Sequence, residues 1–146
     1  MSRTPRFNHV AMSVPADLLD EEGRAELLAF YGEVFGFDEL PTETKNRKQL
    51  VLRAYDNEQF VFLIADDPPM TSAPFDHFGM SVGTVDELDA LLARARAFQA
   101  RDDRVEIIDK KVDDFAGMLK LSSFYVRYRL PLMIEVQHFA WQRGGP

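Results

Sequence analysis

Three residues able to bind a divalent cation stand out in this chain: His9, His77 and Glu135. The two histidines begin two similar segments, HVAMSV at 9–14 and HFGMSV at 77–82. Such self-similarity indicates a fold built from repeated units, and a duplicated fold that pairs equivalent strands would bring both histidines together. Histidine is the commonest metal ligand. Two imidazoles and one carboxylate can hold a divalent ion and leave coordination positions open for a substrate.

Strand parity predicts that these three side chains share one kind of surface. Successive side chains of a strand point to opposite faces, and in each segment the bulky apolar residues alternate with the candidate ligand. The apolar face must be the one covered by a helix, so the ligands point onto the open face. A mid-strand carboxylate such as Glu135 is costly there unless it is paired or bound. The helix-side residues are Val10, Met12, Val14, Phe78, Met80, Val82, Leu132, Ile134 and Val136.

The elements that would position these residues form two similar series. The first is a strand, a helix capped by Asp20 and ended by Gly36, and further strands; the second begins with the capping box of Thr84 and Glu87. In the first series we expect strands at Phe7–Val14, Phe37–Thr44, Gln49–Tyr55 and Phe60–Ile64 and a helix at Arg24–Phe35. In the second we expect strands at His77–Val82, Val105–Ile108, Leu119–Tyr128 and Leu132–His138, with a helix whose buried stripe is Leu88, Leu91, Leu92, Ala95 and Phe98.

The two series define the domain organisation. Residues 1–65 form the first unit, 66–74 a proline-containing linker, and 75–146 the second unit, and 146 residues suit one domain with a shared core. The net charge of −7 argues against nucleic acid or an anionic membrane as partner. The chain has no cysteine, which excludes disulfides and thiolate chemistry. No secretory signal or membrane-spanning run is present, so we expect a cytoplasmic protein.

Three motifs, in this order along the chain, resemble the vicinal oxygen chelate superfamily of glyoxalase I, bleomycin- and fosfomycin-resistance proteins and extradiol dioxygenases. They are FYGEVFGF at 30–37, similar to the family's "FY…LGF" helix end; HFGMSV at 77–82, followed by Asp86-Glu87-Leu88; and Phe124-Tyr125-Val126-Arg127 leading to LMIEV at 132–136. The resemblance implies an α+β fold in which two βαβββ units form a curved mixed sheet, a glyoxalase-like cup, with helices on the outer face. By position, His9, His77 and Glu135 match the metal ligands of the three-ligand members.

The chain also departs from the family's patterns. Tyr125 lies ten residues before Glu135, as the tyrosine of extradiol dioxygenases lies before their glutamate ligand, but residues 115–118 offer no accompanying histidine. The four-ligand pattern of glyoxalase I is absent, because the first-unit counterpart of Glu135 falls at Phe62 or Leu63. The turn Tyr128–Pro131 replaces the usual Asp-Pro-x-Gly.

The leading hypothesis is a metal-dependent enzyme that acts on a small oxygen-bearing substrate, either dioxygenase-like or a glyoxalase-like lyase or isomerase. The ion would be Fe²⁺ or Mn²⁺, with Zn²⁺ or Ni²⁺ as further candidates, and would act as a Lewis acid. Tyr125 would be the catalytic proton donor or acceptor, and Arg127, Ser81 and Gln137 would contact the substrate. The alternative is a metal-free binding protein of the bleomycin-resistance type. A homodimer is a further expectation.

Each of these residues also has a structural interpretation. The histidines can be polar residues at strand starts, Tyr125 a half-buried strand residue, and Arg127 a solvent-facing cation. The third histidine, His138, has helix-side parity and is expected to be structural.

Overall fold

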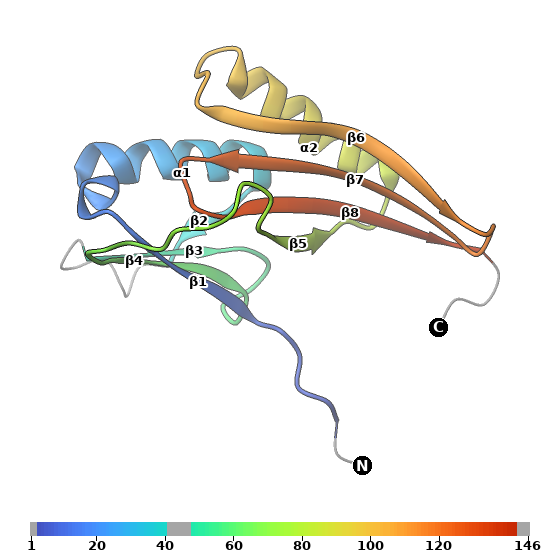
Figure 1. The fold of residues 1–146 in the computed structure, drawn as a ribbon, viewed down its shortest axis with the longest axis horizontal. Helices are drawn as coiled ribbons and strands as arrows, with labels where there is room; N and C mark the ends of the chain where they lie inside the picture. Colours follow the sequence, from blue (N-terminus) through green and yellow to red (C-terminus); the bar gives the residue numbers. More distant parts are fainter. Residues whose placement is uncertain (1–2, 41–47, 143–146) are drawn as a thin grey trace. The chain divides into compact units, whose positions relative to one another are not determined.

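The computed structural model describes residues 3–40 and 48–142, and the chain divides into two compact units, Met1–Thr71 and Ser72–Pro146. The first unit contains β1 (His9–Val14), a 3₁₀ turn η1 (Ala16–Leu19), α1 (Glu21–Phe35), β2 (Asp38–Glu39), β3 (Gln49–Arg53) and β4 (Phe60–Ala65). Its sheet has the order β1-β4-β3-β2, and only the β1–β4 pair is parallel. The helix lies over one face of this sheet (Figure 1).

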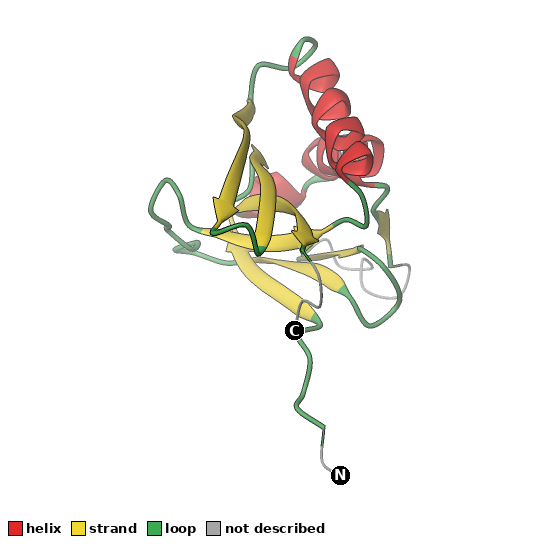
Figure 2. Ribbon diagram, turned by 90° about the vertical axis from the view of Figure 1, so that its right-hand side faces the viewer, coloured by secondary structure: helices red, strands yellow, loops and turns green. Residues whose placement is uncertain are grey.

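The second unit repeats this plan, with longer strands after its helix. It contains β5 (His77–Ser81), α2 (Val85–Gln99), β6 (Val105–Phe115), β7 (Leu119–Tyr128) and β8 (Met133–Trp141). The sheet order is β5-β8-β7-β6, with β5 parallel to β8 and the other pairs antiparallel. Helix α2 packs along one side of its sheet, against β6, β7 and β8 (Figure 2). The expected α+β fold with two βαβββ units is therefore confirmed.

The predicted caps at Asp20, Gly36 and Thr84 are present, although α1 begins at Glu21, three residues before the expected Arg24. The Asp20 carboxylate accepts a hydrogen bond from the Gly23 amide at 2.7 Å, and Gly36 ends α1 with a φ of 75°, a left-handed conformation that glycine adopts without strain. In α2 the Thr84 hydroxyl accepts from the Glu87 amide at 3.1 Å, while the Glu87 carboxylate accepts from the Thr84 amide at 3.3 Å. This is the expected capping box.

Burial follows the predicted parity in β1 but not in β8, where Met133 and Glu135, predicted on the open face, are buried like Ile134 and Val136. Met12 and Val14 of β1 are buried, whereas His9 and Ala11 are exposed. The predicted stripe of α2 is buried in full. The helix-facing apolar side chains therefore form the core of each unit, as burial of a sheet face under a helix requires. The largest side chains that are less than 2% exposed belong to Tyr31, Tyr128, Phe30, Phe124, Met12, Leu19, Leu27, Leu50, Leu52, Leu63, Leu88 and Ile134.

Several expected boundaries were wrong. Strand β6 continues from Val105 to Phe115, well past the predicted end at Ile108, because it pairs with β7 on both sides of a register shift between Ile108 and Lys111. The charged residues of β6 hide this strand from an apolar pattern. Of the strand expected at Phe37–Thr44, the structure has β2 at Asp38–Glu39, and residues 41–44 of that prediction lie outside the described part of the chain.

The capping box yields a stability prediction. Thr84→Ala removes the hydroxyl that accepts from the Glu87 amide and should lower the free energy of unfolding by about 1 kcal/mol. Thr84→Ser keeps that acceptor and is the matched control. Urea denaturation followed by circular dichroism measures both variants, and equal stabilities for the two would contradict this account of the cap.

Candidate functional site

The register of the second sheet brings three of the predicted residues together. Glu135 lies on β8 between Gly79 of β5 and Tyr125 of β7, and both neighbours pair with it directly. His77 is two residues before Gly79, so it lies on the same face of β5. The glycine leaves room at this point: a Cβ at residue 79 would lie 3.1 Å from Oε1 of Gln137, the next residue of β8 on that face.

The side chains of His77, Glu135 and Tyr125 are close in space. The Nε2 atom of His77 lies 3.8 Å from Oε2 of Glu135, and its ring meets the Tyr125 ring edge-on with 5.0 Å between centroids. The Glu135 side chain is 11% exposed, whereas that of His77 is 40% exposed. An inward carboxylate and a more open imidazole thus form a polar cluster on this sheet.

One hydrogen bond determines which nitrogen of His77 carries its proton. The Nδ1–H group donates to the carbonyl oxygen of Phe75 at 2.7 Å, so in the neutral ring Nε2 carries the lone pair, 3.8 Å from Glu135. A lone pair and a carboxylate at this separation repel each other unless a proton or a cation lies between them. A metal-binding histidine commonly donates its other N–H in this way. The pair therefore fits as two ligands of a divalent ion.

Tyr125 differs electrostatically from an ordinary tyrosine. A hydrogen bond to the Glu135 carboxylate, together with partial burial and the negative charge, raises the pKa of Tyr125 to about 12. The phenol is therefore neutral at physiological pH, and its O–H acts as a donor.

The other predicted site residues of this unit are Arg127, Ser81 and Gln137. Arg127 donates two hydrogen bonds to Glu106, at 2.7 and 2.8 Å, and one to the Pro131 carbonyl at 3.3 Å. The hydrogen bonds from the Arg127 guanidinium are the main reason that the pKa of Glu106 is lowered. Ser81 and Gln137 pair in register on β5 and β8. Their substrate-binding roles stay predictions.

The third predicted ligand, His9, belongs to the first unit. Its Nδ1–H donates to Oδ1 of Asn8 at 2.7 Å, and its ring stacks on Phe60 with centroids 4.8 Å apart. Within residues 3–40 and 48–142, no group of three or more His, Asp or Glu side chains is placed to hold a metal ion. The structure thus brings together His77, Glu135 and Tyr125, while His9 stays a predicted ligand.

The register also identifies the first-unit counterpart of Glu135. Ala11 pairs with Phe62 as Gly79 pairs with Glu135, so Phe62 is the equivalent residue. A phenylalanine cannot bind a metal ion, and the register selects Phe62 over Leu63, the two residues that the sequence left open; the number of protein ligands stays a prediction.

Sequence reasoning missed the groups that orient the histidines and the arginine. The Phe75 carbonyl is a backbone group and gives no signal in the sequence. Asn8 does give one, because a polar residue precedes each histidine of the repeat. Glu106 could be paired with Arg127 only once the β6–β7 register was known.

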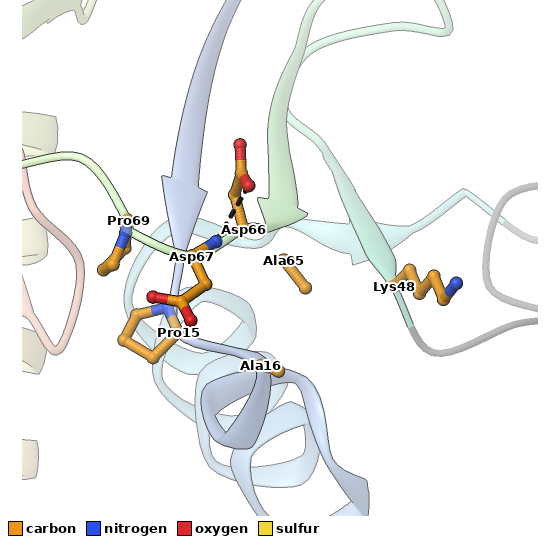
Figure 3. Close-up of a pocket in the computed structure, with 7 residues that line it drawn as sticks. All are labelled: Pro15, Ala16, Lys48, Ala65, Asp66, Asp67 and Pro69. Carbon is orange, nitrogen blue, oxygen red and sulfur yellow. Dashed lines mark hydrogen bonds between the residues drawn. The ribbon is translucent and has the colours of Figure 1, made fainter.

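A separate hollow in the first unit contains none of these residues. It is lined by Pro15, Ala16, Lys48, Ala65, Asp66, Asp67 and Pro69, and the Asp67 amide donates to the Asp66 carboxylate at 2.8 Å (Figure 3). None of the residues that line it is a histidine or a predicted site residue, so this hollow is separate from the candidate site.

Comparison with protein families is decisive for the identity of the fold. Residues 19–120 match the model of the Glyoxalase/Bleomycin resistance protein/Dioxygenase superfamily. The chain belongs to this superfamily. Among curated proteins, no sequence matches the chain significantly.

Three solved structures illustrate the similarity. A variant of the fosfomycin resistance protein FosX from Listeria monocytogenes, solved with Mn(II) and 1S,2S-dihydroxypropylphosphonic acid, is 14% identical, with 92% of each chain covered and a TM-score of 0.61. Lactoylglutathione lyase from Agrobacterium tumefaciens is 16% identical, covering 94% of this chain and 96% of its own, with a TM-score of 0.60. A putative glyoxalase family protein from Bacillus anthracis is 21% identical, covering 96% and 99%, with a TM-score of 0.58. At these identities the structures show a common fold. Neither of the described helices is long and apolar enough to cross a membrane.

The elevated pKa of Tyr125 can be tested in metal-free protein. Glu135→Gln removes the negative charge and the ionic hydrogen bond, so the pKa of Tyr125 should fall from about 12 toward 10. In the native protein, the raised pKa stabilises the fold below pH 10, and this contribution is lost as the pH rises toward 12.

The measurement is an NMR titration of ring-labelled tyrosine, with Tyr125→Phe to assign the signal. Tyr55 is exposed and serves as an internal reference. An unchanged titration in Glu135→Gln would show that this carboxylate does not cause the shift.

Proposed function

We propose that the protein is a divalent-metal-dependent enzyme of the vicinal oxygen chelate type, with His9, His77 and Glu135 as metal ligands. The observation that supports this most strongly is the His77–Glu135 pair, in which the imidazole Nε2 atom and a carboxylate oxygen lie 3.8 Å apart. Glu135 sits in the interior of a sheet, where an uncompensated charge is costly. A bound cation would neutralise it.

The composition of this ligand set determines the chemistry on offer. Two neutral imidazoles and one carboxylate leave a bound divalent ion with a net positive charge and open positions. Such an ion supplies Lewis-acid stabilisation of negative charge on a substrate with two adjacent oxygens. Nitrogen and oxygen ligands suit Fe²⁺ and Mn²⁺, and Zn²⁺ or Ni²⁺ also accept them. The Mn(II) complex of the FosX variant from Listeria supports Mn²⁺ as the first ion to test.

The remaining residues bind the substrate and hold protons. Tyr125 is protonated at physiological pH and does not serve as the resting general base. Its single O–H, which donates to Glu135 in the metal-free protein, would donate to a substrate oxygen once Glu135 binds the ion. Arg127 is held in place by Glu106 and the Pro131 carbonyl, which fixes the direction of its guanidinium. Ser81 and Gln137 provide polar contacts at the carboxyl end of β5. The reaction is dioxygenase-like or that of a glyoxalase-like lyase or isomerase.

The ligand assignment is tested by metal analysis after equilibrium dialysis with Mn²⁺. We expect the native protein to bind one ion per ligand set and His77→Ala and Glu135→Ala each to lose most of it, because two ligands rarely retain a divalent ion. His138→Ala, which changes a histidine of the same strand as Glu135, is the matched control and should bind normally. If both site variants bound as much Mn²⁺ per chain as the native protein, the proposed metal centre would be wrong.

A complementation experiment determines which chain supplies His9. We propose a homodimer, and each copy carries both half-sites. Mixing His9→Ala with Glu135→Ala chains regenerates an intact ligand set in a heterodimer only if His9 comes from the other copy. Restored Mn²⁺ binding in the mixture would indicate a shared site, whereas none would place all three ligands in one chain.

A second candidate function has one specific observation in its favour. Beyond Gln137, the open face of β8 continues into Phe139 and Trp141, whose stacked rings are 40% and 48% exposed with centroids 6.5 Å apart. Leu121 and Leu119 pair with them on β7. Exposed apolar residues in a contiguous row indicate a binding surface. A metal-free protein that binds an aromatic ligand would use this surface.

Trp141 is the only tryptophan of the chain, so its fluorescence reports on this surface alone. If the protein is a metal-free binder, a flat aromatic probe such as anilinonaphthalene sulfonate should quench Trp141 equally with and without a chelator. Phe139→Ala should weaken that quenching, and Phe7→Ala, at an exposed aromatic of the first unit, should not. Absence of saturable quenching would contradict the binding function.

A further inference from the structure

The residue before each histidine occupies the same place in the repeated backbone. The carbonyl oxygen of Asn8 accepts a hydrogen bond from the Phe60 amide at 3.1 Å, and that of Asp76 accepts from the Met133 amide at 3.0 Å. In both units this bond ties the start of the histidine strand to its parallel neighbour. Asn8 and Asp76 are therefore equivalent positions.

Their side chains serve different purposes. The Asp76 carboxylate accepts from the Ala73 amide at 2.9 Å, and the Nδ1–H of His77 donates to the Phe75 carbonyl. In the first unit, by contrast, the Asn8 side chain itself accepts from the Nδ1–H of His9 at 2.7 Å. A side-chain oxygen thus performs for His9 the task that a backbone oxygen performs for His77.

We propose that Asn8 is a positioning residue for His9. It holds the imidazole in the tautomer with the proton on Nδ1, so that Nε2 presents its lone pair. Phe60 restricts the plane of the ring, since the two rings stack with only 8° between their planes. Together these contacts restrict the rotation of the ring and favour Nδ1 as the protonated nitrogen. The significance of this for metal binding rests on the proposed function, but the tautomer does not.

The first test is NMR of the imidazole nitrogens in the metal-free protein, at a pH where the ring is neutral. His9 should show the Nδ1–H tautomer in the native protein. In Asn8→Leu, which has a similar volume and no acceptor, the Nε2–H tautomer should become substantially populated. Asn8→Asp retains an acceptor oxygen and should keep the native tautomer. His77, held by a backbone carbonyl, is the internal control and should not change in either variant.

The second test is the affinity for Mn²⁺ alone. Loss of the outer hydrogen bond to a metal-binding histidine weakens binding about tenfold or more, so Asn8→Leu should show such a loss and Asn8→Asp should not. A native tautomer at His9 in Asn8→Leu would overturn the proposal. If His9→Ala bound Mn²⁺ as the native protein does, the ligand role of His9 would fail, and the tautomer experiment would still decide the role of Asn8.

Discussion

The burial of the Glu135 carboxylate within the second sheet is the constraint on which the candidate site depends. A charge there must be balanced, and the neighbours that β5 and β7 supply are an imidazole and a phenol. The phenol responds with a raised pKa. The imidazole presents a lone pair because its other nitrogen is already engaged. None of these features requires a special backbone conformation; they follow from register.

Duplication explains why the two units look alike and differ in chemistry. Both place a histidine at the start of an edge strand that runs parallel to its neighbour. The neighbour then decides what surrounds it, since Glu135 of one unit is replaced by Phe62 in the other. His9 stacks on Phe60, whose counterpart in the second unit is Met133, whereas His77 lies beside the Glu135 carboxylate. One scaffold thus provides two unlike half-sites.

Most of the fold could be predicted because helices and apolar strands carry local signals. Asp20, Gly36 and the Thr84 capping box mark the helix ends, and alternation of apolar residues marks the faces of β1 and β8. The predicted β6 was too short because many of its side chains are charged. Pairing with β7 is what holds the rest of this segment as a strand. Pairing between distant segments leaves little trace in local composition.

The sequence by itself determined the repeat, the parity of the candidate ligands and the family, because these depend on residue type and spacing along the chain. The tertiary structure alone decided that His77 meets Glu135 and Tyr125, which nitrogen of His77 is free, and that Arg127 is held by Glu106. The physical reason is the distance along the chain over which each signal acts. Periodicity records which face a residue occupies, whereas hydrogen bonds and pKa values depend on distances of a few ångströms between strands that are remote in sequence.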